Sequence, residues 1–397
     1  ACTTRPSTSS RGGRSAPLSR SVTTITPVTT ASSERILRCP PPKAPTTPPA
    51  EMPNPVVEPG GEIAFAAMHL DHGHIYGMIN GLTGGAGGTL TWVYDPQPER
   101  VAAFVEKFPD VKVARSEEEI LEDPPAVKLV AAAAVPADRA PLGIRVMEAG
   151  KDYFTDKTPA DLPRPARCRE GRRRPHRTQV LGLLLRADPR RGRGPRRTAH
   201  RRGAIGKVIQ VMGMGPHRLG DPDSRPDWFY ERARYGGILT DIGSHNFEQM
   251  LTFTGSDDAE ISSSAIGNFA HHAYPPELDD FGEASIALSS GASGYVRVDW
   301  FTPPAGLRTW GDGRTFILGT DGYMELRKYI DVTTDNGGGQ LLLVDGEGEH
   351  RIDATGKVGY PFFGGADPRC PERHRECHDP GACVQAVELA VRAQEPS

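Results

Sequence analysis

Three histidines, His69, His72 and His74, lie within six positions in the stretch HLDHGHIYGM. They follow the apolar run IAFAAM, which is typical of a buried β-strand. Imidazole nitrogens just past a strand end can bind a metal ion such as zinc. The same place in a doubly wound sheet is the turn that accepts a nucleotide phosphate, usually with glycines. The rest of the chain has to separate these two interpretations.

Two charged residues end later predicted strands. Asp95 closes TWVYD about 20–25 residues after the first strand–helix turn, where an acid accepts the hydroxyls of an adenosine ribose. No basic residue follows it directly, which favours NAD over NADP; a turn-forming aspartate before Pro96 is the simpler alternative. Lys157 closes YFTDK at the carboxyl edge of the predicted sheet, where ligands bind, although a solvated lysine would also fit there.

The sharpest spacing is in GGILTDIGSHNFEQM, where Asp241 and His245 are four residues apart. On a helix this spacing places both side chains on one face. A carboxylate beside a histidine can orient the ring and raise its pKa, which suits a general base. We expect Gly236 and Gly237 to let the chain approach a ligand closely. An ordinary helix with a polar face is the alternative.

The predicted elements that position these residues follow two patterns, one of alternating strands and helices and one of successive strands. Residues 62–157 alternate short strands with helices, which predicts a doubly wound parallel sheet. Within them Ser116 is expected to cap a helix, Gly150 to end another, and the glycine-rich stretch 81–88 to form a connecting loop. Residues 203–365 contain successive strands and hairpins interrupted by one helix, which predicts an α+β domain with a large, mostly antiparallel open sheet.

Three segments depart from these patterns. Residues 1–60 are rich in Ser, Thr, Pro and Arg, which predicts a disordered leader; an organelle transit peptide has a similar composition. Residues 158–202 and the tail at 366–397 are rich in Arg and Pro, apart from a residual helix in VQAVELAVRAQ. We interpret these two segments as frame-shifted coding sequence, with a basic nucleic-acid-binding segment as the alternative. In 158–202, QVLGLLLR is the part that could still pair as a strand.

Bulk properties exclude several classes of function. The net charge of −3 implies no general affinity for nucleic acids, and no apolar run reaches the ~18 residues of a membrane span. A disulfide framework and a zinc site at Cys370, Cys377 and Cys383 remain weaker alternatives, because the chain is long and the cysteine spacings do not match zinc knuckles.

Together these motifs resemble the glucose–fructose oxidoreductase, inositol dehydrogenase and MocA family of nicotinamide-dependent enzymes. The family's glutamate-lysine-proline motif appears here as Asp156-Lys157-Thr158, and its later Asp-x-Gly-x-His helix is intact as Asp241, Gly243 and His245. The resemblance implies a Rossmann domain, an open-sheet α/β domain, and subunit contacts through that sheet. The family's G-x-G-x-x-G turn is replaced by HLDHGH, in which Asp71 would repel a pyrophosphate.

The sequence therefore predicts a cytoplasmic, homo-oligomeric oxidoreductase that uses NAD, or less favourably NADP, on a sugar- or polyol-like small molecule, with no nucleic-acid, membrane or metal partner. We expect Lys157 to polarise the reacting oxygen, His245 to move its proton, and Asp241 to orient His245 or bind a substrate hydroxyl. Trp228 and Tyr235 could line the substrate site. The predicted cofactor-binding residues are Leu70, Asp71, His72, Gly73, Asp95, Pro136 and Lys157. The alternatives are a metal-dependent hydrolase on a (β/α)8 barrel that uses His72 and His74, and a catalytically impaired family member.

Overall fold

The computed structural model describes residues 63–86, 88–122, 127–160, 180–182, 203–221, 225–270, 277–303, 313–328, 339–354 and 380–395. The expected leader at residues 1–60 lies outside them. So do most of the Arg-rich segment 158–202 and the first part of the tail, residues 366–379.

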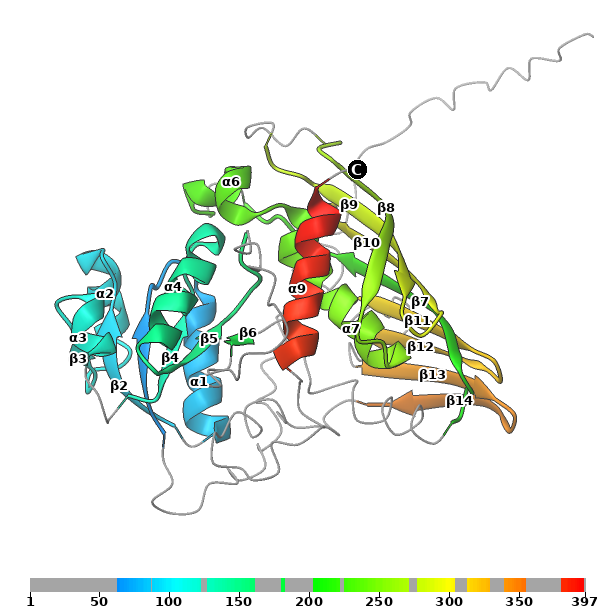
Figure 1. Cartoon of the computed structure of the whole chain (residues 1–397), viewed down its shortest axis with the longest axis horizontal. Coiled ribbons are helices and arrows are strands. Elements are labelled where there is room, and N and C mark those ends of the chain that lie inside the picture. Colours follow the sequence, from blue (N-terminus) through cyan, green and yellow to red (C-terminus); the bar gives the residue numbers. More distant parts are fainter. Residues whose placement is uncertain are drawn as a thin grey trace, which may run out of the picture. The chain divides into compact units, whose positions relative to one another are not determined.

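The first sheet contains six parallel strands in the order β3-β2-β1-β4-β5-β6, the strand order of a Rossmann fold. Its strands are β1 (Ala64–Met68), β2 (Thr89–Tyr94), β3 (Lys112–Val113), β4 (Leu129–Ala132), β5 (Asp152–Thr155) and β6 (Val180–Gly182). The strand β6 falls within QVLGLLLR, as expected. The helices between the strands are α1 (His74–Ala86), α2 (Pro98–Val105), α3 (Glu117–Leu121) and α4 (Pro136–Glu148) (Figure 1).

Burial explains why the central strands are continuously apolar. Every residue of β4 is buried, and so are the last four residues of β1, because helices cover both faces of a parallel sheet. The chain order reverses between β1 and β4, and ligands bind to such sheets at this switch point, outside the carboxyl ends of the strands. The fold therefore brings the turn after β1 and the residues after β4 and β5 to one edge.

The predicted helix ends are confirmed, and the predicted glycine-rich loop is only partly so. Ser116 caps α3, accepting a hydrogen bond from the Glu119 amide, and Gly150 has a positive φ of 75° just after α4. The loop expected at residues 81–88 was wrong in its first part, because α1 continues to Ala86. Ile75, Met78, Ile79 and Leu82 are all buried, and this helical spacing of apolar side chains outweighs the helix-breaking tendency of the glycines.

The second sheet has eight strands in the order β14-β13-β12-β11-β7-β10-β9-β8. All neighbours pair antiparallel except β7 and β10, which are parallel. The strands are β7 (Val208–Pro216), β8 (Ala259–Gly267), β9 (Phe281–Leu288), β10 (Ser293–Asp299), β11 (Arg314–Gly319), β12 (Tyr323–Lys328), β13 (Gly339–Asp345) and β14 (Gly348–Asp353). Both sheets are open, so the (β/α)8 barrel of the hydrolase alternative is wrong.

Helices cover one face of the second sheet. They are the π-helical turn η3 (Leu239–Gly243), α7 (Ser244–Thr254) and α9 (Pro380–Gln394). Two short helices, η2 (Asp227–Tyr230) and α6 (Arg232–Tyr235), pack against each other, and α6 also packs against α4 of the first sheet. In Figure 1, α7 and α9 lie beside each other against the second sheet. Among the described helices, none is long and apolar enough to cross a membrane.

The last residue of α9 ties this helix to the π-helical turn. The buried Gln394 side chain accepts from the Leu239 amide at 2.9 Å and donates to Asp279 Oδ2 at 2.8 Å. A Cβ added at Gly237, where φ is 88°, would lie 2.1 Å from Gln394. The close approach that we expected at Gly237 is therefore made to a side chain of α9.

We expect Gln394→Leu to lower the free energy of unfolding by about 1–3 kcal/mol, because the Leu239 amide and Asp279 would lose a buried partner. Gln385→Leu on the same helix, which removes an exposed contact to Asp258, should change it by less than about 0.5 kcal/mol. Urea unfolding monitored by circular dichroism measures both. Equal effects of the two substitutions would contradict a structural role for the Gln394 contacts.

Candidate active site

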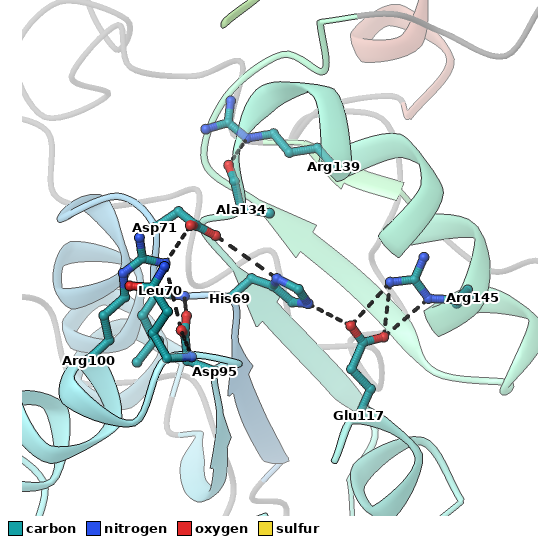
Figure 2. Close-up of polar contacts among 10 residues, drawn as sticks. His69, Leu70, Asp71, Asp95, Arg100, Glu117, Ala134, Arg139 and Arg145 are labelled. Carbon is teal, nitrogen blue, oxygen red and sulfur yellow. Dashed lines mark hydrogen bonds and ion pairs between the residues drawn. The ribbon is translucent and has the colours of Figure 1, made fainter. Parts of the chain in front are cut away.

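The turn after β1 adopts its conformation without the glycines that are usual at this position. His69 takes a positive φ of 52°, a conformation that glycine adopts far more readily. Its Nε2 donates to Glu117 at 2.7 Å, and Glu117 also pairs with Arg145 of α4 at 2.9 Å. Figure 2 shows the His69 ring between Asp71 and Glu117. Side-chain contacts thus fix a backbone conformation that a glycine would allow by itself.

The carboxylate of Asp71 is balanced by a residue that the sequence did not indicate. Arg100, in α2, reaches back to Asp71 at 2.5 Å and lies 3.6 Å from Asp95 (Figure 2). Asp95 itself has a fully buried side chain and accepts hydrogen bonds from the amides of Leu70, at 2.6 Å, and Gln97, at 2.8 Å. Asp95 therefore joins the end of β2 to the turn after β1.

A buried carboxylate forms the centre of the neighbouring cluster. Asp156 follows β5 and has no exposed side-chain surface; its Oδ1 lies 3.1 Å from Arg139 and its Oδ2 lies 2.5 Å from His74 Nδ1. His72 Nδ1 lies 3.7 Å from the same Oδ2. Burial alone would raise the pKa of Asp156, but Arg139 and the hydrogen bond from His74 outweigh burial and lower it. Asp156 is therefore ionised at neutral pH.

The next residue, Lys157, connects the two parts of the site. Its ammonium lies 3.1 Å from Asp241 Oδ1 and donates to the Asp241 carbonyl at 3.1 Å. Burial alone would raise the pKa of Asp241, but Lys157 outweighs it, so the pKa is lowered. Asp241 belongs to the π-helical turn η3, a local irregularity that is frequent at functional sites. Asp241 thus pairs with Lys157, and its expected role toward His245 stays a prediction.

Three further residues that we expected in the site, His245, Trp228 and Tyr235, are all buried, and Tyr235 lies in the hydrophobic core. His245 is buried in the first turn of α7, and Trp228 is buried in η2 with its ring centroid 6.4 Å from that of His72. Burial lowers the pKa of His72 to about 4, so its ring is neutral near pH 7. Tyr235 lies in the core, where its hydroxyl accepts from the Asp279 amide at 2.9 Å, an environment that favours packing over substrate contact.

The remaining predicted residues line the switch point. Gly73 is exposed, and a Cβ there would meet nothing within 4 Å. Pro136 begins α4, and its carbonyl accepts from the Ala160 amide at 2.9 Å. A Cβ added at Gly236 would lie 2.7 Å from the Ala160 backbone, so this glycine makes room for the chain after Lys157.

Comparison with known proteins identifies the family. The family model of the GFO/IDH/MocA C-terminal domain matches residues 197–325. The crystal structure of a protein assigned as an oxidoreductase from Erwinia carotovora atroseptica SCRI1043 shares 40% identity, covering 84% of this chain and 98% of that one, with a TM-score of 0.75. The chain belongs to the GFO/IDH/MocA family. Curated proteins gave no match.

More distant GFO/IDH/MocA relatives share the fold. Levoglucosan dehydrogenase, solved with NADH and levoglucosan, is 15% identical, covers 84% of this chain and 90% of its own, and has a TM-score of 0.58. Aldose-aldose oxidoreductase from Caulobacter crescentus, solved with glycerol, is 18% identical, with coverages of 84% and 97% and a TM-score of 0.61. At these identities the two structures show a shared fold.

The residues at the switch point can be tested for their fit to a dinucleotide. Lys157, paired with Asp241, follows β5 at the carboxyl edge of the parallel sheet, where ligands bind in doubly wound folds. At the turn, the Asp71 carboxylate opposes a pyrophosphate, but Arg100 neutralises it and Gly73 leaves space. The residues of this turn are therefore compatible with a dinucleotide, and Asp71 is the group least suited to its phosphates.

We expect Lys157→Met to lower the free energy of unfolding by about 3 kcal/mol, because it leaves the Asp241 carboxylate buried without its partner. The double variant Lys157→Met/Asp241→Asn should recover much of this loss. Arg234→Met, which breaks the exposed pair with Glu231, should cost less than about 1 kcal/mol. Denaturant unfolding of these proteins measures the losses, and the single variant Asp241→Asn completes the double-mutant cycle that gives the coupling between Lys157 and Asp241.

The stability difference between the native protein and Lys157→Met should depend on pH. In the native protein the Asp241 pKa lies below its ordinary value of 3.8, so the carboxylate stabilises the fold above that pH. In Lys157→Met, burial raises the Asp241 pKa. The contribution of Asp241 to the free energy of unfolding of this variant is therefore largest at low pH and falls as the pH rises. The stability difference between the two proteins should narrow as the pH falls toward 3.8, and a constant difference would contradict the pair.

Proposed function

We propose that the protein is a nicotinamide-dependent oxidoreductase that acts on a hydroxyl or carbonyl group of a sugar- or polyol-like substrate. The observation that carries the proposal is the Lys157–Asp241 ion pair at the carboxyl edge of a Rossmann sheet, in a chain whose family consists of oxidoreductases. The sugar-like ligands of its structural relatives support the substrate class.

The proposed cofactor-binding residues are Leu70, Asp71, His72, Gly73, Asp95, Pro136 and Lys157. When bound, the nicotinamide ring would accept or supply the hydride. Among the residues of the chain, Lys157 polarises the reacting oxygen through its ammonium, which Asp241 orients. His245 accepts the hydroxyl proton in oxidation and returns it in reduction. Trp228 offers an apolar ring face to the sugar.

The choice between NAD and NADP depends on Arg100. We keep NAD as the prediction, because Asp71 already engages this guanidinium at 2.5 Å. A free arginine beside the acid at the end of β2 would instead suit the 2′-phosphate of NADP. Homo-oligomerisation through the open face of the second sheet and a cytoplasmic location are further parts of this proposal.

We expect His245→Ala to lower turnover by about 10²–10⁴-fold with a smaller change in KM, because it removes the proton-transfer group. The measurement is nicotinamide absorbance with a panel of aldoses and polyols. His350→Ala on the edge strand β14 serves as the matched control and should retain the native rate. A His245→Ala variant with near-native turnover would remove this residue from the mechanism.

Titration calorimetry should show dinucleotide binding that is tighter for NAD than for NADP. Asp71→Asn should raise the affinity for each dinucleotide by roughly tenfold, which corresponds to about 1.4 kcal/mol. The gain should be larger for NADP than for NAD, because the substitution releases Arg100 to bind the 2′-phosphate. Glu99→Gln, an exposed change of equal charge on α2, should leave both affinities unchanged. If the folded native chain binds neither dinucleotide, the proposed function is wrong; if Asp71→Asn has no effect, the role of Asp71 is wrong.

A further inference from the structure

A second chemical possibility arises from the histidines of the turn. The sequence predicts no metal ion here, because the later predicted strands end in Pro136 and Lys157 and offer no further ligands. The structure supplies one: Asp156, which follows β5, meets His72 and His74 from the turn after β1. One ligand atom from each of the three residues lies within 4.8 Å of the other two.

The spacing of the three groups suits a small transition-metal ion. Zinc lies about 2.0–2.2 Å from imidazole nitrogen or carboxylate oxygen, so tetrahedral ligand atoms stand about 3.4 Å apart. The observed separations from Asp156 Oδ2 are 2.5 Å for His74 Nδ1 and 3.7 Å for His72 Nδ1, which bracket that value. Two changes would complete the geometry: a small rotation of the His74 ring with its proton moved to Nε2, and release of the hydrogen bond that His72 Nδ1 accepts from the His74 amide at 3.2 Å.

The carboxylate is already held as a metal ligand needs to be. Arg139 binds Asp156 Oδ1, which leaves Oδ2 directed at the histidines. Arg139 is fixed in turn by the carbonyls of Ala134, at 2.8 Å, and Thr158, at 3.1 Å. Such supporting contacts orient metal ligands and raise their affinity.

One side of the cluster remains open. The side chains of His72 and His74 are 26% and 17% exposed, whereas Asp156 has no exposed surface. Trp228 lies beside His72, and its buried indole N–H has no hydrogen-bond partner among the described residues. That donor could bind an oxygen in a fourth coordination position.

We propose that His72, His74 and Asp156 form a binding site for one divalent transition-metal ion of the zinc class, with a fourth position open to water or substrate oxygen. Two imidazoles and one carboxylate match the ligand set of open, catalytic zinc sites. The site does not depend on dinucleotide binding. An ion there would act as a Lewis acid toward an oxygen in the same crevice as Lys157.

The test is titration of the full chain with Zn²⁺ and Co²⁺ alone, in a background where Cys370, Cys377 and Cys383 are replaced by serine so that thiolates cannot compete. Calorimetry and elemental analysis give the stoichiometry, and the visible bands of Co²⁺ report the coordination geometry. We expect one ion per chain and tetrahedral Co²⁺ bands without sulfur charge transfer.

His72→Ala and Asp156→Asn should each weaken Zn²⁺ binding by at least about 100-fold, at or beyond the upper end of the 10–100-fold loss seen for supporting residues. His350→Ala should leave the affinity unchanged. His72 is partly exposed, so its variant should fold even if Asp156→Asn does not, and circular dichroism checks both. No binding by the folded chain, or binding that His72→Ala leaves intact, would overturn the proposal and leave the cluster a hydrogen-bonded His–Asp pair.

Discussion

The buried charge of Asp156 is the constraint around which the crevice is organised. A carboxylate without exposed surface is costly unless it is paired, and the fold supplies Arg139 from α4 and His74 from the start of α1. These contacts join the segments after β1, β4 and β5 at the switch point. Lys157, the next residue, is thereby directed toward the second domain.

The link to the second domain depends on a similar balance. Lys157 and Asp241 neutralise each other in a largely buried setting, and Asp241 sits in a π-helical turn whose first amide is held by Gln394 of α9. The last helix of the described chain therefore supports the turn that carries Asp241. Packing against α9 and ion pairing with Lys157, just after β5, act on the same five-residue turn.

The turn after β1 illustrates how a fold tolerates side chains where glycines are usual. His69 holds a left-handed backbone conformation with help from Glu117, and Asp71 is neutralised by Arg100. These contacts stabilise the turn. A ligand at the turn would therefore meet two imidazoles and a paired carboxylate in place of bare backbone amides. The same crevice thus combines a dinucleotide fold with the ligand types of a metal centre.

The sequence by itself determined the two kinds of sheet, most strands and the Ser116 cap, because strand and helix periodicity and capping motifs are local properties. Short motifs also selected Lys157, Asp241 and His245 as candidates, and their roles stay predictions. Only the tertiary structure decided that Asp156 meets His72 and His74, that Arg100 reaches Asp71, that Asp241 pairs with Lys157, and that Gly237 makes room for Gln394. Each of these contacts joins residues separated by tens of positions or more. Their partners are set by strand order and helix packing, which no local pattern encodes.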